Sequence, residues 1–201
     1  MKLAVRVAVL CLAVTASASA DPVPGLGVRD RNIITAENLF GSLELNQKTG
    51  DDNEKEAGSV TQRYVPLAGL TQLGYHRVIS DQVTLGMNVL VGRSKADGSD
   101  ANVAAYLRPR VGYTLPLSPT FSVWLRGGVL VAHERAGEDR RSALSGGADV
   151  LVALTPAPHV GLFGGLLFEA PLWGRSKTSG RDSEKYELTS TGLTVGALVD
   201  F

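Results

Sequence analysis

The sequence lacks three features: a set of cysteines, an excess of charge of one sign, and a long apolar segment in its main part. Its 201 residues include a single cysteine, Cys11, which excludes a disulfide framework and a cysteine-based zinc site. Lys and Arg number 20 and Asp and Glu number 20, so we expect no nucleic-acid partner. Beyond residue 20, no uncharged apolar stretch reaches the roughly 18 residues of a membrane-spanning helix. At 44% apolar residues the chain is still too hydrophobic to be disordered, which leaves a packed or a membrane-embedded fold.

The first 20 residues have the features of a secretory signal peptide. Lys2 and Arg6 form a positively charged segment before an apolar run over residues 7–14, and a small-x-small pattern ends on Ala20. We therefore expect cleavage between Ala20 and Asp21. An uncleaved anchor helix is the less favoured alternative, because the apolar run is much shorter than the roughly 20 residues that such a helix needs. Loss of Lys2 and Arg6 leaves 18 basic and 20 acidic residues, a formal net charge of −2.

The rest of the chain alternates apolar and polar residues with a period of two, which is the pattern of β-strands. Phe121, Val123 and Leu125 fall on one parity of such a segment, and Ser122 and Trp124 fall on the other. No segment shows the apolar stripe of a helix, and glycine is spread through almost all of them. We expect eight strands, at about residues 32–47, 61–79, 83–91, 103–115, 121–132, 144–154, 160–168 and 186–201.

The connections between these strands alternate between long, charged segments and short segments with turn residues. The long ones are expected at residues 48–59, 94–101, 134–142 and 175–185, and the short ones at residues 80–82, 116–120 and 155–159. When an even number of strands has all of its short turns at one end, the strands form an up-and-down closed barrel. The sequence therefore predicts an all-β fold, an eight-stranded antiparallel up-and-down β-barrel with both termini at the short-turn end.

The side chains on the two parities indicate which face of the barrel is outside. The lysines after the signal peptide all lie in the expected long connections: Lys48, Lys55, Lys95, Lys177 and Lys185. A solvated strand face normally carries several lysines, so this distribution favours a transmembrane barrel; a soluble periplasmic barrel remains the alternative. Aromatic residues on the apolar parity lie beside the short turns and the C-terminus, as in an aromatic girdle at a membrane interface. The girdle residues are Tyr75, Tyr113 and Phe121, with Phe201 at the same depth.

The last expected strand ends the chain on an aromatic residue. Residues 186–201 alternate up to Phe201, which resembles the C-terminal strand by which Gram-negative outer-membrane β-barrels are recognised by their assembly machinery. With this last strand, the signal peptide and the alternation of long loops and short turns, the chain resembles the small eight-stranded class that includes OmpX-like, OmpW-like and OmpA-transmembrane-like barrels. The resemblance implies a short periplasmic segment at residues 21–30, an outer-membrane barrel at residues 31–201, and Phe201 as the assembly signal. It also implies periplasmic termini, extracellular long loops, and contact with outer-membrane lipids, lipopolysaccharide and the assembly machinery.

Charged residues on the inward parity predict an ion-pair network inside the barrel. If the short turn pairs Leu115 with Phe121, the same register places Arg110 opposite Arg126, and two adjacent guanidinium groups need acids. Asp149 lies as far from its short turn as Arg126 does from the preceding one, so it is the first candidate partner. Because unpaired charges in a narrow lumen cost several kcal/mol, a closed network is favoured over a charged conduit. The expected network consists of Glu44, Arg108, Arg110, Arg126, Asp149 and Glu169, with Asp200 also on the inward parity.

The sequence offers little catalytic chemistry, and no cofactor or metal is expected. His76, His133 and His159 lie on different segments without metal-ligand spacing, and the acidic residues 51–56 are expected to form a solvated loop. Some small outer-membrane barrels are lipid-modifying enzymes that use His, Ser and an acid at the membrane rim, and His133 with Glu134 fits that reading, although no motif of those enzymes is present. We therefore expect a non-enzymatic barrel that serves envelope integrity, adhesion or surface contact. The alternatives are a narrow transporter for small, apolar molecules and a rim enzyme.

Overall fold

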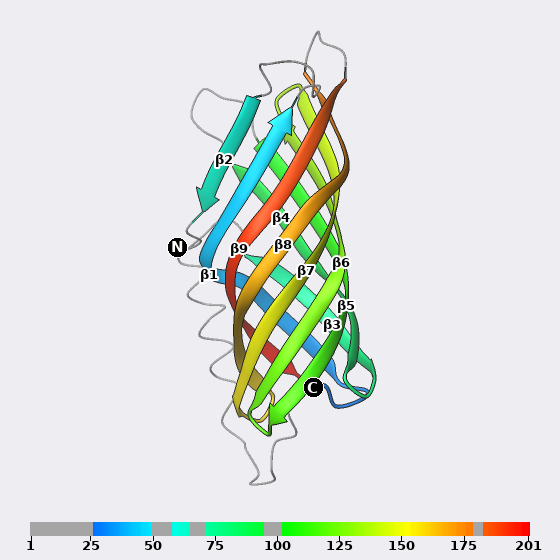
Figure 1. The fold of residues 1–201 in the computed structure, drawn as a ribbon, viewed down its shortest axis with the longest axis vertical. Helices are drawn as coiled ribbons and strands as arrows, with labels where there is room; N and C mark the ends of the chain where they lie inside the picture. The colour runs from blue at the N-terminus through cyan, green and yellow to red at the C-terminus, as the bar shows by residue number, and fades with distance from the viewer. Residues whose placement is uncertain (1–25, 50–57, 65–70, 95–101, 179–182) are drawn as a thin grey trace.

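The computed structural model describes residues 26–49, 58–64, 71–94, 102–178 and 183–201, with the backbone alone for residues 40–49, 58–64 and 93–94. The regular elements in these ranges are β-strands (Figure 1). They are β1 (Asn32–Thr49), β2 (Gly58–Tyr64), β3 (Gln72–Ser80), β4 (Val83–Ser94), β5 (Asn102–Ser118), β6 (Phe121–Ala136), β7 (Asp139–Ala157), β8 (Val160–Lys177) and β9 (Glu184–Asp200). The described residues contain no helix long and apolar enough to cross a membrane.

The strands form a closed antiparallel ring. Consecutive strands pair from β3 to β9, and β9 also pairs with β1. The first half of β1 pairs with β3 and its second half pairs with β2, so that β2 and β3 share one position in the ring. The ring therefore has eight strand positions, which confirms the predicted fold, and the expected strand at residues 61–79 fills its position in two pieces.

Alternation along each strand places one set of side chains in the lumen and the other on the outer surface. On β4, Thr84 and Asn88 are buried, whereas Leu85 and Val91 are 51% and 73% exposed. The same pattern from β3 to β9 produces an outer belt of exposed apolar side chains, as lipid contact requires. The outer belt includes Leu73, Met87, Val111, Leu125, Val150, Leu162, Leu166, Phe168 and Leu193.

The short turns and the last residue of the chain gather at one end of the barrel, at the bottom of Figure 1. Phe201 and Asn32 exchange backbone hydrogen bonds of 2.8 and 2.9 Å there, so the C-terminus closes the ring against the start of β1. The segment before β1 folds against this end, where the carbonyl of Gly27 accepts from the backbone N–H of Gln82. This contact brings Leu26 into the lower part of the lumen, where it is buried.

Aromatic side chains surround the short-turn end on the outer surface. Tyr75 and Tyr113 are 50% and 43% exposed, and their hydroxyls donate hydrogen bonds to Asn32 and Gln82, respectively. Phe121 is partly buried in the same part of the barrel. An amphipathic ring with a polar tip at this level is typical of a membrane interface.

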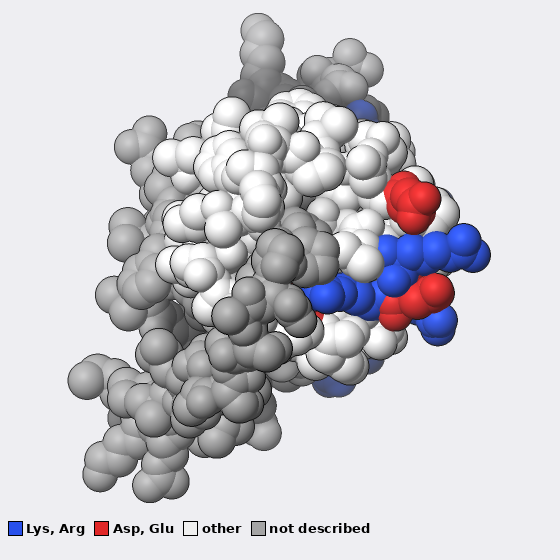
Figure 2. Space-filling view, turned by 90° about the horizontal axis from the view of Figure 1, so that it is seen from below, with Lys and Arg blue, Asp and Glu red and all other residues white. Residues whose placement is uncertain are grey.

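The charges at the short-turn end form a local group. Seen from below, acidic and basic residues gather mainly on one side, and most of the other described surface in view carries neither (Figure 2). Asp30 lies 3.7 Å from Arg29 and 3.8 Å from Arg77, and all three side chains are well exposed. Such exposed pairs contribute about 0–1 kcal/mol each, so this group is a solvated rim rather than a structural element.

The predicted long connection at residues 134–142 is wrong. The strands continue to Ala136 and from Asp139, and Gly137 takes a positive φ of 61° in the two-residue turn between them. The charges of this segment favoured a loop in the sequence, but a hairpin ladder also persists where both faces meet water. Lys48, Lys177 and Lys185 likewise lie near strand ends and not, as expected, in loops.

The predicted register between β5 and β6 is also wrong, by two residues. β5 continues to Ser118 before a two-residue turn, so Leu115 pairs with Val123 and not with Phe121. The tighter turn moves every later pair of this hairpin by the same amount. Arg110 and Arg126 therefore do not face each other across the two strands.

Candidate functional site

The described side chains fill the lumen in three layers. A lower apolar layer lies near the short turns, a charged layer lies in the middle, and an upper apolar layer lies beyond it. The lower apolar layer consists of Leu26, Ile33, Val78, Trp124, Leu151, Ala153, Phe163 and Leu198. The upper apolar layer consists of Leu130, Ala132, Ala143, Leu167, Tyr186 and Leu188, with Tyr106 packed against it.

The charged layer is one alternating chain of ion pairs that crosses the lumen. Its members, in order of contact, are Glu37, Arg126, Asp149, Arg110, Glu169 and Arg108. They come from five strands, and none is more than 5% exposed. Among the described side chains, three carboxylates face three guanidinium groups, so these six charges sum to zero. Each charge has a partner of opposite sign, which offsets much of the cost of burial, although Nε of Arg108, Nη1 of Arg110 and Oδ1 of Asp149 have no hydrogen-bond partner among the described residues.

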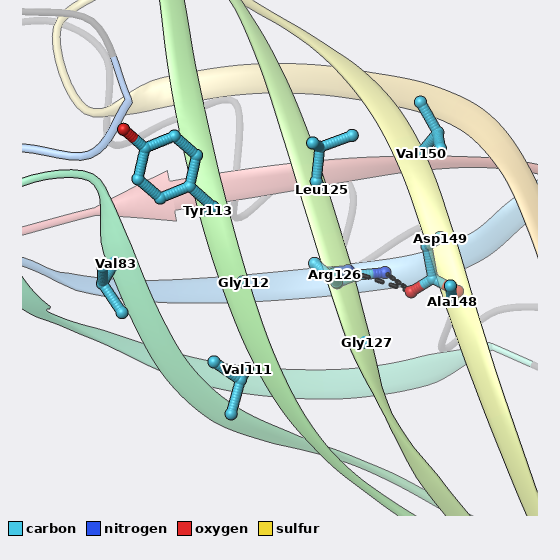
Figure 3. Close-up of a pocket in the computed structure, with 10 residues that line it drawn as sticks. All are labelled: Val83, Val111, Gly112, Tyr113, Leu125, Arg126, Gly127, Ala148, Asp149 and Val150. Atoms are coloured by element: carbon cyan, nitrogen blue, oxygen red, sulfur yellow. Dashed lines mark hydrogen bonds and ion pairs between the residues drawn. The ribbon is translucent and has the colours of Figure 1, made fainter.

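Arg126 is the centre of the charged layer. Its Nε donates to Oδ2 of Asp149 at 3.0 Å, and its Nη2 lies 2.8 Å from the same oxygen. Figure 3 shows these two side chains reaching toward each other from the adjacent strands β6 and β7. On its other side, Arg126 holds Glu37 with both terminal nitrogens, with Nη2 donating to Oε2 at 2.9 Å. The guanidinium also lies over the Trp124 ring, 4.8 Å from its centroid, which joins the charged layer to the lower apolar layer.

Glu169 binds the remaining two arginines, one with each oxygen. Nη2 of Arg108 and Nη2 of Arg110 each donate to it at 2.9 Å. Arg110 is also 3.6 Å from Oδ1 of Asp149, which connects this half of the layer to Arg126. The large side chains fit because glycine lies opposite them: a Cβ on Gly147 would come within 2.5 Å of the Glu169 side chain.

Glu37 is the member of the charged layer that the sequence analysis missed. A bulge in β1 follows it, where Asn38 takes a left-handed φ of 57°. Thr194 fixes this bulge, since its hydroxyl accepts from the backbone N–H of Asn38 and donates to the side-chain carbonyl. The bulge interrupts the alternation of β1 and hides the position of Glu37. The available signal was the parity of the preceding residues, because Ile33 and Thr35 are buried in the same alternation.

Two other charged residues expected in the lumen are placed differently. The backbone of Glu44 pairs with Thr191, but its side chain lies outside the described residues. Asp200 lies at the short-turn end, where it accepts from Nη1 of Arg31 at 2.7 Å and lies 3.3 Å from Nδ1 of His159. It therefore belongs to the mouth of the barrel and not to the charged layer.

The three histidines do not form a common site. His76 is buried in the lumen, His133 lies on the outer surface, and His159 lies in a short turn. His133 Nδ1 is 3.0 Å from Oγ of Ser142, but within the described ranges no carboxylate forms an ion pair with His133. Glu134, the acid weighed in the sequence, instead accepts a hydrogen bond from Tyr106. No group of three or more metal-ligating side chains occurs in the described part of the chain.

The outer wall beside the charged layer carries a shallow groove on β4 to β7 (Figure 3). Val83, Val111, Leu125 and Val150 line it with apolar side chains. Gly127 lies between them, and a Cβ there would meet only a carbonyl oxygen at 3.8 Å. The groove is thus a mainly apolar part of the outer belt.

Comparison with known proteins identifies the fold. No protein-family model matches the chain, and no curated protein sequence matches it. Among solved structures, it is similar to the crystal structure of Neisserial surface protein A, with 12% identity and a TM-score of 0.54 over 85% of this chain and 97% of that one. It is also similar to the outer membrane protein AlkL in DMPC lipid bilayers, with 12% identity and a TM-score of 0.57 over 92% and 97% of the two chains. The closed ring, the outer belt and these two structures agree with the class that the sequence resembles: the chain has the fold of the small eight-stranded outer-membrane β-barrels.

Proposed function

We propose that the protein is a non-enzymatic, non-conducting outer-membrane barrel whose long-loop end serves surface contact, adhesion or envelope integrity. The observation that carries this proposal is the charged layer. Among the described side chains it is neutral, each member has a partner of opposite charge, and it lies between two apolar layers, so an ion entering the lumen would have to replace an existing partner.

The outer belt and the C-terminus support the location. Exposed apolar side chains on every strand from β3 to β9 need a lipid environment. Phe201 closes the ring and is 58% exposed, so it is accessible to the assembly machinery as an outward terminal aromatic. The expected signal peptide, with cleavage between Ala20 and Asp21, would direct the chain to the periplasm, from which it would insert.

Planar-bilayer recording tests the closed lumen. We expect no stable conductance steps from the wild-type barrel. The Glu37→Ala/Arg126→Ala variant removes the centre of the charged layer. It serves as the positive control, because conductance steps from this variant show that the recording detects an opened barrel. Reproducible steps from the wild type would contradict the proposal, as would its recovery in the soluble periplasmic fraction.

A lipid A mass profile tests the absence of enzymatic activity. Cells with the wild type and cells with His133→Ala are expected to have the same lipid A species, because His133 and Ser142 have no acid among the described residues to complete a catalytic set. Loss of an acyl chain that depends on His133 would establish a rim enzyme.

Trypsin treatment of intact cells tests the orientation. Arg77 lies in β3 near the short turns, which would face the periplasm, so it should be spared. Lys55 and Arg181 lie in the expected long loops and should be cut. Cleavage after Arg77 with both loop sites spared would mean that the barrel is inserted the other way round.

A narrow transporter is the second candidate, and one observation favours it. Within the described residues, β2 pairs only with β1, and the end of β4 from Leu90 to Ser94 pairs only with β5. Among the described residues, no backbone pairing joins β2 to this end of β4, on the side of the upper apolar layer, and we name this place the seam. Uptake of a small apolar probe into vesicles, faster with the protein than without it, would favour sideways passage through this seam over the closed barrel.

A further inference from the structure

The ends of β6 to β9 that lie farthest from the short turns carry a row of cations on their outer face. Arg135 pairs with Arg140, and Arg140 pairs with Lys177. In the adjacent row, Arg175 pairs with Lys185. Paired residues on antiparallel strands share a face, so these side chains form one surface. The outer basic surface, as we name it, consists of Arg135, Arg140, Arg175, Lys177 and Lys185, all of them exposed.

Little negative charge compensates this surface. Lys185 is paired with Glu187, with Nζ 2.9 Å from Oε1. Arg135 donates from Nε to the carbonyl of Gly137, which is a neutral partner. Among the described residues, no carboxylate forms an ion pair with Arg135, Arg140, Arg175 or Lys177. Like charges directly opposite each other destabilise a pair of strands. Binding of an external anion would reduce the repulsion between these cations.

An apolar row continues directly from the outer basic surface. Trp173 pairs with Leu144, and Leu144 pairs with Val131. This row lies two residues nearer the short turns than the row of Arg175, a distance of about 7 Å along a strand. Trp173 is 53% exposed and Val131 is 45% exposed. A ligand bound on this face would thus contact cations with its polar part and the apolar side chains at the top of the outer belt with its adjoining apolar part.

We propose that the outer basic surface binds the phosphate groups of a phosphorylated lipid headgroup in the outer leaflet. Guanidinium groups bind phosphate with two parallel charge-assisted hydrogen bonds, and Trp173 together with Val131 would lie against the acyl chains. The adjoining apolar row favours a lipid over a soluble phosphate, which would use the cations alone. The inference rests on the proposed membrane location and orientation, because only there does this face meet an outer leaflet.

The test titrates the folded barrel in detergent with bisphosphorylated lipid A and with enzymatically dephosphorylated lipid A. The surface variant is Arg140→Gln/Arg175→Gln, and the matched control is Arg29→Gln/Arg77→Gln at the other rim. Since a hydrogen bond to a charged group is worth about a factor of ten or more, we expect the surface variant to bind bisphosphorylated lipid A at least about tenfold more weakly. We expect the control to bind as the wild type does, and dephosphorylated lipid A to bind weakly to all three proteins.

Several outcomes would overturn the inference. One is equal binding by the surface variant and the wild type, and another is an equal loss in the control variant. A third is displacement of the bound lipid A by inorganic phosphate at a concentration equal to that of the lipid, which would show that the surface is a general anion site. Heat-dependent mobility on gels verifies that each variant is folded. The planar-bilayer recording keeps the two proposals apart, since a conducting barrel with phosphate-dependent lipid binding would contradict only the closed lumen.

Discussion

Removal of Arg126 is the sharpest test of the charged layer. Arg126→Met keeps most of the side-chain volume but removes the guanidinium group that contacts both Glu37 and Asp149, through nitrogen–oxygen distances of 2.8 to 3.0 Å and a further short contact. The two carboxylates then remain buried, and the layer carries a net charge of −1. Breaking a buried pair by removing one partner costs about 3–5 kcal/mol. Because Arg126 and its partners are at most 4% exposed, solvent screening reduces this cost little.

The exposed pair of Arg77 and Asp30 provides the matched control. Their side chains are 59% and 70% exposed and 3.8 Å apart, so Arg77→Met should cost about 0–1 kcal/mol. Urea titration of the barrel in detergent, followed by tryptophan fluorescence and gel mobility, measures both variants. With an m-value of about 2 kcal/mol/M, a loss of about 3 kcal/mol lowers the midpoint by about 1.5 M.

A double-mutant cycle locates the cause of that loss. In Glu37→Gln/Arg126→Met the unpaired Glu37 charge is absent, so the double variant should be more stable than the sum of the single losses predicts, by about 0.5–3 kcal/mol. If Arg126→Met and Arg77→Met have the same midpoint, or if the two losses simply add, the charged layer does not stabilise the barrel as a unit.

Two further changes test the closure of the ring and the packing behind the arginines. Deletion of Phe201, or Phe201→Asp, should lower the amount of folded protein in the outer membrane, and a normal amount by quantitative blotting would show that the terminal residue is dispensable. Gly128→Ala should destabilise the barrel by about 1–3 kcal/mol, since its Cβ would lie 2.1 Å from the carbonyl oxygen of Pro109 and 3.1 Å from Cδ of Arg110. Gly127→Ala, with its nearest atom at 3.8 Å, should unfold at the wild-type urea concentration, and equal losses in the two variants would contradict the packing argument.

The strand count and the inward parity are predictable from the sequence because both depend only on alternation. The contact of Arg126 with Asp149 is of this kind: both residues lie equally far from their short turns, and the structure pairs them in register. The register between β5 and β6 is harder to predict from the sequence, because it depends on whether Ser118 belongs to the strand or to the turn. The continuation of β5 beyond Leu115 to Ser118 moves the partner of Arg110 from Arg126 to Gly128.

The remaining errors arise where local rules compete with long-range pairing. Alternation fails at Asn38, because a contact with Thr194, which is 156 residues away in sequence, stabilises the bulge. Polarity suggests a loop around Gly137, although the backbone ladder of the hairpin continues to the turn. Neither effect is encoded in a short window of sequence.

The position of Glu37 on β1 has a consequence for the order of assembly. Strands β5 to β8 contribute three arginines but only two carboxylates, Asp149 and Glu169, to the charged layer. A sheet of these four strands alone would carry an uncompensated positive charge on the face that becomes the lumen. The missing carboxylate arrives only when β1 joins the other side of the barrel. The described charges of the interior are therefore balanced only once β1 has joined the ring, so a half-open sheet of β5 to β8 would hold an arginine without its carboxylate partner.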